Sequence, residues 1–244
     1  MSTERGRDEA SGRAREIEAR LRPMGTQDRR DFMARTMTTS MEALGVAVPD
    51  LRPVVTDAAR ELKKAPPDQV LDLARALIRG GTFEGRQVAY ELLAGHRATL
   101  SGITREQVLE LGHGMDNWCS VDTWATLIAG PAWRTGRLSD ADVEGWIRTG
   151  DRWWRRAAVV FTVALNQKAR GGTGDVPRTL RTCEMAIADH DDMVVKALSW
   201  ALRELSKRDP AAVVGFLDEH DAVLASRVKR EVGAKLRTGR KNPR

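Results

Sequence analysis

The feature of this sequence that most constrains its fold is a series of amphipathic helical segments with almost no strand pattern between them. In PPDQVLDLARALIRGG, residues 66–81, apolar residues recur on one broad helical face: Val70, Leu71, Leu73, Ala74, Leu77 and Ile78. Two prolines precede this segment and two glycines follow it, as is usual at helix starts and stops. Hairpin dipeptides of the Asn-Gly or Asp-Gly type do not occur in the sequence, and only one tyrosine is present. The pattern therefore predicts an all-α chain.

Segments of the same kind recur along the whole chain. They are separated by breakers such as LRPMG, KKAPP, RGG, AGPAW, RGGTGDVP and KRDP. The predicted helices span residues 9–22, 26–44, 50–64, 68–79, 83–95, 104–113, 118–129, 139–149, 151–167, 176–189, 192–207, 210–218 and 222–236. Two helices in roughly 35–45 residues is the spacing of helical repeat arrays. Since no strict consensus repeats, the periodicity by itself predicts a HEAT-like helical array and nothing finer.

The two ends of the chain differ in composition from this array. Residues 1–22 contain six arginines against five acidic residues, which predicts a charged, flexible leader before a single domain over residues 23–237. The segment SRVKREVGAKLRTGRKNPR, residues 226–244, has eight basic residues and one acidic residue, and it ends in a basic tail over residues 238–244. Such a segment is either a solvated, frayed terminus or a set of phosphate contacts, the latter including Lys229 and Arg230.

Composition narrows the class of protein. The net charge is +6, from 40 Lys and Arg against 34 Asp and Glu, which is compatible with nucleic acid but does not establish it. No apolar run approaches the roughly 18 residues that span a membrane, and the N-terminus is charged where a secretory signal is apolar. We therefore expect a cytoplasmic protein and no membrane association. Two cysteines, 64 positions apart, and four scattered histidines indicate neither a metal site nor a disulfide framework.

The stretch MDNWCSVD, residues 115–122, places an indole and a carboxylate at i and i+4 of a helix that starts near Asn117. Trp118 and Asp122 then lie on one face, a turn apart. Taken alone, the pair is more typical of packing, with Trp118 in a core or interface and Asp122 paired with an arginine. The other interpretation is an active site.

A second candidate is DRWWRRAAVVFTVALN, residues 151–166, whose run from Ala157 to Leu165 is apolar almost all round, as in a central buried helix. Its first turn carries Arg155 and Arg156, although the helix dipole favours anions there. The placement indicates that these guanidiniums serve a ligand or partner. The alternative is a salt bridge to Asp151 or Asp140.

A third candidate is DDMVVKALSWALRELSKRDP, residues 191–210. Lys196, Trp200 and Arg203 fall at i, i+4 and i+7, which forms a cationic and aromatic stripe suited to a DNA backbone. The alternative is an ordinary amphipathic helix whose basic side chains extend to solvent.

Together these blocks resemble the AlkD-like family of DNA alkylation repair glycosylases, which are built from HEAT-like repeats. The resemblance covers about residues 30–237. LGVAVPDLRPVV at 44–55 is similar to the family's Gly-Val-x-x-Pro-x-x-Arg segment, and FEGRQVAYELL at 83–93 to its Glu-x-x-x-x-Ala helix. DNWCSVD, RWWRRAAVVF and VVKALSWALRELSKRDP are similar to its three most diagnostic blocks. The implied fold is an α-helical superhelix whose concave, basic face binds duplex DNA.

The resemblance assigns roles to the residues already singled out. It implies that Asp122 stabilises the positive charge that develops on the sugar when a cationic N3- or N7-alkylpurine departs, and that Trp118 and Trp200 line that sugar. It implies that Arg156 binds a phosphate. The DNA-binding set predicted on this basis is Arg155, Arg156, Lys196, Arg203, Lys229 and Arg230.

The implied activity is that of a monofunctional, monomeric DNA glycosylase without a cofactor. Because the family is thought to act without extruding the base into a fitted pocket, bulky adducts are expected to be tolerated. One position departs from the family pattern: Cys119 stands where the family usually has aspartate. The alternatives are a non-catalytic module that binds damaged or branched DNA, as some members of the family do, and a HEAT-like scaffold for protein partners.

Overall fold

The computed structural model describes residues 2–241, and the side chains of residues 5–241. Within this range the chain is helical and contains no β-strand beyond one isolated bridge between Glu42 and Thr82, so the prediction of an all-α fold is confirmed. The chain divides into two compact units, Met1–Trp124 and Ala125–Arg244. Each unit is described by itself below.

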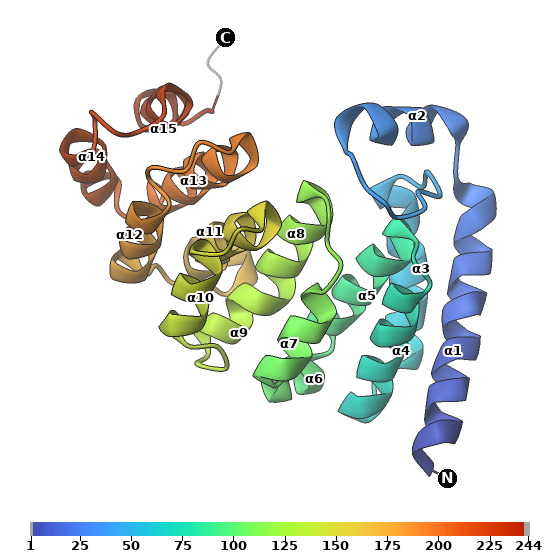
Figure 1. The fold of residues 1–244 in the computed structure, drawn as a ribbon. Coiled ribbons are helices and arrows are strands. Elements are labelled where there is room, and N and C mark those ends of the chain that lie inside the picture. Colours follow the sequence, from blue (N-terminus) through green and yellow to red (C-terminus); the bar gives the residue numbers. More distant parts are fainter. Residues whose placement is uncertain (1, 242–244) are drawn as a thin grey trace. The chain divides into compact units, whose positions relative to one another are not determined.

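The first unit consists of helices joined by turns and loops (Figure 1). Helix α4 packs against both α1 and α5, while α8 packs against α5 and α7. The element bounds are α1 Ser2–Leu21, a 3₁₀ turn Arg22–Met24, α2 Gln27–Thr36, α3 Val48–Glu61, α4 Pro67–Arg79, α5 Phe83–Gly95, α6 Arg97–Gly102, α7 Arg105–Gly112 and α8 Trp118–Trp124. The helix predicted over residues 26–44 ends eight residues early, at Thr36.

The N-terminal segment is a structured helix, and the prediction of a flexible leader over residues 1–22 is wrong for its described residues. Helix α1 packs against α4 and buries an apolar stripe of Ala10, Ala14, Ile17 and Leu21. The charged residues that suggested a leader occupy the other faces of α1, and some of them form ion pairs with α3: Arg13 with Glu61 at 2.5 Å and Arg20 with Asp57 at 2.8 Å. The segment is thus an amphipathic helix with few but regularly spaced apolar residues.

Two of the sequence blocks in the first unit are held together by one buried carboxylate. Glu84, in the first turn of α5, accepts hydrogen bonds from the backbone N–H groups of Leu44, Gly45 and Val46 at 2.8, 2.9 and 3.1 Å. Gly45 has φ +82°, and a Cβ there would lie 2.6 Å from the carbonyl oxygen of Thr26. Successive N–H groups around a left-handed residue form an anion-binding concavity, here filled by Glu84.

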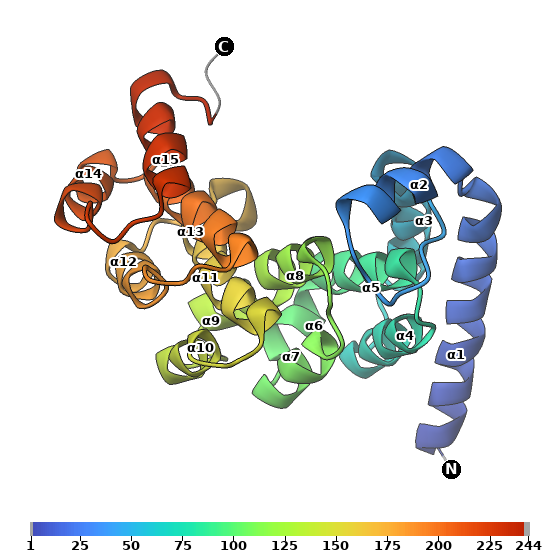
Figure 2. The same ribbon diagram turned by 45° about the horizontal axis from the view of Figure 1, so that its top comes forward.

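The second unit is organised around one buried helix, α11. From Arg156 to Asn166 every residue of α11 is buried, as predicted from its apolar circumference. Helices α9, α10, α12 and α13 pack against it, and α13 in turn packs against α15 (Figure 2). The bounds are a π-helical turn Ala125–Ala129, α9 Gly130–Arg134, α10 Asp140–Ile147, α11 Arg152–Asn166, a 3₁₀ turn Lys168–Arg170, α12 Val176–Met185, α13 Asp192–Leu205, α14 Pro210–Glu219 and α15 Ser226–Thr238.

Aspartates cap four helices of the second unit. The side chains of Asp151, Asp175, Asp191 and Asp209 accept backbone N–H groups in the first turns of α11, α12, α13 and α14, respectively. Each caps N–H groups that have no partner within the helix. The breakers RGGTGDVP and KRDP, identified in the sequence as separators, thus contain the N-caps of α12 and α14.

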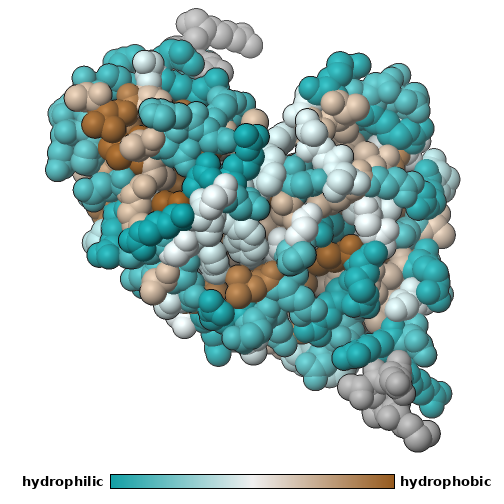
Figure 3. All heavy atoms as spheres, in the orientation of Figure 1, coloured by the Kyte–Doolittle hydropathy of each residue, from teal (hydrophilic) through white to brown (hydrophobic). Residues whose placement is uncertain are grey.

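The face of the molecule seen in Figure 3 is mainly hydrophilic, with an apolar area over α14 at the upper left. Val214 of α14 is 44% exposed and Val223, which follows this helix, is 55% exposed. No described helix is both long and apolar enough to cross a membrane.

Candidate nucleic-acid interface

Helix α8 carries the predicted tryptophan and aspartate. Trp118 is its first residue and Asp122 lies one turn further on, so the predicted i, i+4 arrangement is present on a single helix. Trp118 is 38% exposed, whereas Trp124 at the other end of α8 is fully buried. The Trp118 Nε1–H donates to the carbonyl oxygen of Thr36 at 3.3 Å, the last residue of α2. The indole is therefore held in place along its edge while much of its surface stays open to solvent.

The two residues before Trp118 anchor α8. Asn117 is fully buried, and its Oδ1 accepts the backbone N–H of Ser120 at 2.9 Å, as an N-cap residue does. The Asp116 carboxylate accepts hydrogen bonds from the Thr39 hydroxyl, the Ser40 backbone N–H and the Asn117 amide. Asp116 and Asn117 thus fix the start of α8 to residues 39–40, which sets the position of the Trp118 indole.

The anchor predicts an acid-sensitive contribution to stability. Burial raises the pKa of Asp116, but the hydrogen bonds from Ser40, Thr39 and Asn117 outweigh it and hold the pKa below its ordinary value of 3.8. The stabilisation is therefore complete above the unfolded pKa, about 3.9, and is lost as pH falls through the lower folded value. Asp116→Asn should reduce the loss of unfolding free energy between about pH 5 and pH 2, measured by urea unfolding. If the free energy of unfolding falls equally with pH in the variant and in the wild type, this prediction is contradicted.

Cys119, the departure from the family pattern, has an apolar environment. It is partly buried and packs against a cluster formed by Met33, Met37 and Phe83, from α2, its C-terminal flank and α5. A cysteine behaves in such a place as a small hydrophobic residue. This packing supports a structural role for position 119 in seating α8.

The second predicted block begins α11. Arg156 is buried, 5% exposed, and its Nη1 donates to the carbonyl oxygen of Met193 at 2.5 Å, in the first turn of α13. Arg155 pairs through Nε with Asp189 at 2.7 Å. The alternative partners predicted for these arginines are engaged elsewhere, since Asp151 caps α11 and Asp140 accepts the Trp133 Nε1–H at 2.7 Å. Arg155 is therefore neutralised locally, and a phosphate would have to compete with Asp189.

The third block forms α13, where Lys196, Trp200 and Arg203 occur at the predicted helical spacing. The Lys196 ammonium pairs with Asp192 at 2.6 Å, and the Arg203 Nε donates to the Ser199 hydroxyl at 3.3 Å. Trp200 is partly exposed, and no described residue accepts a hydrogen bond from its Nε1–H. An indole edge with an unused donor can hydrogen-bond a phosphate or sugar oxygen.

Helix α15 packs beside α13 and supplies the remaining basic residues (Figure 2). Lys229 pairs with Asp221 at 3.0 Å, whereas Arg230 is exposed and has no ion-pair partner among residues 2–241. Glu231 of α15 is buried and accepts the Ser199 hydroxyl at 2.6 Å, which ties α15 to α13. The frayed terminus considered from the sequence is thus an ordered helix as far as Thr238, and residues 242–244 lie outside the described part of the chain.

Within each unit, the structure places some of the predicted site residues on one helix or on two helices in contact. In the first unit Trp118 and Asp122 share α8, and in the second unit Arg156 reaches the start of the helix that carries Lys196 and Trp200. The roles of Asp116, Asn117 and Glu84 were not identified from the sequence, and each of these residues has hydrogen-bond partners 38 to 78 residues away in the chain. Their only indication in the sequence was their position inside the segments that resemble the family.

Comparison with known proteins bears on the family and the fold of the chain. Residues 17–236 match the family model described as DNA alkylation repair enzyme. A solved structure titled as a predicted DNA alkylation repair enzyme from Enterococcus faecalis is similar with a TM-score of 0.64 over 80% of this chain and 88% of that chain. At 18% sequence identity the likeness concerns the fold. No curated protein matches the chain.

Proposed function

The chain belongs to the DNA alkylation repair enzyme family, and from this premise we propose that it is a monofunctional, monomeric DNA glycosylase. Its substrate is duplex DNA that carries a cationic N3- or N7-alkylated purine. The observation that carries the proposal is α8, where the Asp122 carboxylate follows the exposed Trp118 indole by one helical turn. A carboxylate beside an exposed aromatic ring suits a reaction in which positive charge develops on a sugar.

The proposed reaction is hydrolysis of the N-glycosidic bond. Alkylation at N3 or N7 gives the purine a positive charge, so the base leaves as a neutral molecule with the electron pair of the C1′–N bond. The deoxyribose then carries an oxocarbenium-like charge, which the Asp122 carboxylate stabilises. Water adds to C1′ and releases a proton to solvent. Since the leaving group is already activated, the mechanism requires no fitted base pocket, and bulky adducts are accepted.

The second unit contributes to DNA binding in this proposal. Trp200 contacts deoxyribose through its ring and its unused Nε1–H, while Lys196, Arg203 and Arg230 contact phosphates. Arg156 and Lys229 stay in the predicted phosphate-binding set, and Arg155 does so in competition with Asp189. Arg156 also orders the start of α13 through its bond to the Met193 carbonyl oxygen, so part of its contribution is positioning.

Base release from a defined duplex tests the proposal. The protein is incubated with duplexes containing 7-methylguanine or 3-methyladenine, and free base is measured by chromatography. Release above the spontaneous rate supports the glycosylase. Salt-sensitive DNA binding without base release supports the first alternative, a non-catalytic protein that binds damaged or branched DNA. Absence of salt-sensitive DNA binding supports the second alternative, a scaffold for protein partners.

Arg230 provides a test of DNA binding that leaves the fold intact, because its side chain is exposed. Each phosphate contact releases condensed counterions, so the logarithm of affinity falls with the logarithm of salt concentration by about 0.9 per contact on duplex DNA. Arg230→Ala should reduce the magnitude of this slope by about 0.9, measured by fluorescence anisotropy at several salt concentrations. Arg137→Ala, at an exposed arginine between α9 and α10, should leave the slope unchanged. Equal slopes for wild type and Arg230→Ala would remove Arg230 from the interface.

A further inference from the structure

Arg86, in the first unit, is a buried cation to which no carboxylate is bound. The residue is 6% exposed. Its Nη1 donates to the Tyr90 hydroxyl at 3.0 Å and its Nη2 to the carbonyl oxygen of His113 at 3.0 Å. A guanidinium has five N–H donors, and residues 2–241 provide no acceptor for the other three. Burial of a charge without a counter-ion is costly, and buried arginines are normally paired.

The tyrosine beside Arg86 does not neutralise it. Burial raises the pKa of Tyr90 to about 12 despite the nearby guanidinium, and its hydroxyl donates in turn to the carbonyl oxygen of Leu111 at 2.8 Å. The phenol is therefore neutral at physiological pH. Both recorded acceptors of the Arg86 guanidinium are uncharged, so its full positive charge is left for another group.

The Arg86 guanidinium lies beside a cavity. Arg86 lines a hollow of about 360 Å³ together with the ends of α4 and α7, formed by Arg75, Ile78, Arg79, Glu110, Leu111, His113 and Gly114. This volume is near the lower end of the range of small-molecule sites, roughly 300–1,000 Å³. Gly114 has φ +73°, and a Cβ there would lie 3.6 Å from the Arg86 Nη2, so glycine leaves the space beside the guanidinium open.

The other charges of the cavity leave it positive. Glu110 is its single carboxylate, and Arg75 already binds it through Nε at 3.0 Å and Nη2 at 2.7 Å. Arg75 pairs in addition with Asp72 at 3.1 Å. Arg79 is exposed and has no ion-pair partner in the described part of the chain. Arg79 and Arg86 are thus two cations that face the same hollow without a carboxylate of their own.

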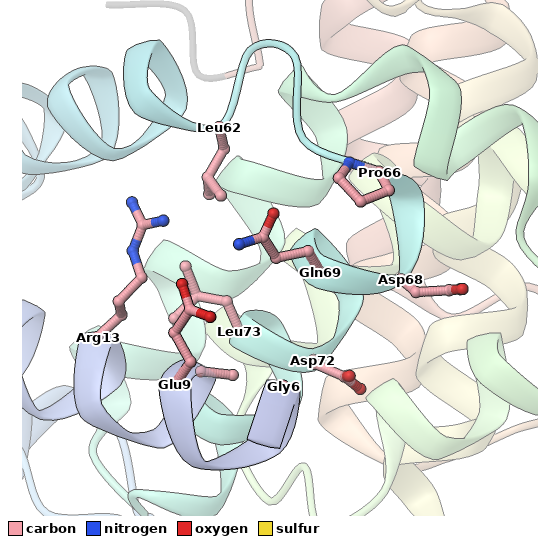
Figure 4. A pocket seen from close by; sticks show the side chains of 10 residues that line it. Gly6, Glu9, Arg13, Leu62, Pro66, Asp68, Gln69, Asp72 and Leu73 are labelled. Carbon is pink, nitrogen blue, oxygen red and sulfur yellow. The ribbon is translucent and has the colours of Figure 1, made fainter. Parts of the chain in front are cut away.

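A neighbouring hollow of the first unit shows the contrasting arrangement. Figure 4 shows a cavity of about 290 Å³ between α1 and α4, where Arg13 and Glu9 lie on one side and Asp68 and Asp72 on the other. The Arg13 guanidinium is neutralised by Glu61 at 2.5 Å. The Arg86 cavity therefore differs from this one both in the sign of its charge and in having a buried guanidinium with unused donors.

We propose that the cavity lined by Arg79, Arg86 and Gly114 binds a phosphoryl oxyanion. Guanidiniums recognise phosphate through paired N–H···O bonds, and the Arg86 donors are fixed in place by Tyr90 and His113. The bound oxyanion supplies the counter-charge that the chain lacks. The proposal does not depend on glycosylase activity, because no residue of the cavity belongs to the proposed chemistry.

Two sources supply this chemistry: free inorganic phosphate and a backbone phosphate of bound DNA. The carbonyl oxygen that holds Arg86 belongs to His113, and five residues later the same connection reaches Trp118, the start of α8. If DNA is the source, the cavity extends the proposed contact with DNA within the first unit. If free phosphate is the source, the site serves a separate ligand.

Calorimetric titration of the full-length protein with inorganic phosphate, at constant ionic strength, tests the site. Wild type should bind phosphate saturably. Arg86→Gln and Arg79→Ala should each weaken binding by about tenfold or more, since each removes a charged donor. Arg52→Ala, at an exposed arginine of α3 outside the cavity, is the matched control and should bind as wild type does. No saturable binding by wild type, or an equal loss in Arg52→Ala, overturns the proposal.

Arg79→Ala protects the test against misfolding, because Arg79 is exposed and its removal breaks no recorded contact. If Arg79→Ala binds phosphate as tightly as wild type, the proposed site is refuted, even if Arg86→Gln fails to fold. Undamaged duplex DNA is then added to the phosphate-loaded protein. Displacement of phosphate identifies a DNA phosphate as the ligand, and retention identifies free phosphate. Asp122→Asn should bind phosphate normally, which separates this result from that of the glycosylase assay.

Discussion

Replacing Asp122 with asparagine is expected to lower the rate of base release from duplex DNA containing 7-methylguanine by about 10²-fold or more, with DNA affinity nearly unchanged. Removal of one preorganised electrostatic group from a transition state typically costs about 10²–10³ in rate. Asparagine keeps the size of the side chain and one acceptor oxygen but removes the negative charge. The rate is measured in single turnover with enzyme in excess, so that product release does not limit it.

Two controls make this expectation specific. Asp50→Asn changes an exposed carboxylate in the first turn of α3 and should release base at the wild-type rate. Trp118→Ala should reduce release without unfolding the unit, because this residue is 38% exposed and its recorded hydrogen bond is a single one, to the Thr36 carbonyl oxygen. Base release by Asp122→Asn at the wild-type rate would refute the proposed mechanism and leave Asp122 a structural residue.

Replacing Glu84 with alanine should destabilise the protein by about 3 kcal/mol or more. The side chain is fully buried and accepts three backbone N–H groups, from Leu44, Gly45 and Val46. Alanine leaves these donors buried without an acceptor, and an unsatisfied buried group costs about 1–3 kcal/mol. Urea unfolding measures the change in free energy, and amide hydrogen exchange should show loss of protection at residues 44–46.

The matched control for this variant is Glu16→Ala, at an exposed glutamate of α1, which should change the free energy of unfolding by less than about 0.5 kcal/mol. Glu84→Gln should fall between the two, since its carbonyl oxygen can accept while its amide nitrogen faces an N–H donor. Protection at residues 44–46 that is unaffected by Glu84→Ala would show that these amides are satisfied without the carboxylate.

The sequence predicted the helices most accurately where apolar periodicity and boundary residues agreed. The segment 68–79 forms α4, Pro67–Arg79, and residues 83–95 form α5, Phe83–Gly95. The predicted helix 26–44 extended past its true end because residues 37–46 leave the helix to reach Asp116 and Glu84. Such long-range hydrogen bonds are invisible to local periodicity.

The prediction for the N-terminal segment differs from the structure for a related reason. Its charge density suggested solvation, but a helix needs only one apolar residue per turn to bury a face against a partner. Ala10, Ala14, Ile17 and Leu21 provide that stripe, and α4 provides the partner. Charge content alone does not separate a flexible segment from an amphipathic helix.

By itself the sequence determined the all-α class, the buried run of α11, the joint placement of Trp118 and Asp122 on one helix face, and the blocks that identify the family. These properties depend on neighbours within a few residues, which helical geometry fixes. Only the tertiary structure decided that Asp116 and Asn117 seat α8, that Glu84 closes a backbone concavity, and that Arg86 is buried beside a cavity without a carboxylate. Those properties depend on which distant segments meet, because burial and partners set the energy of a polar group.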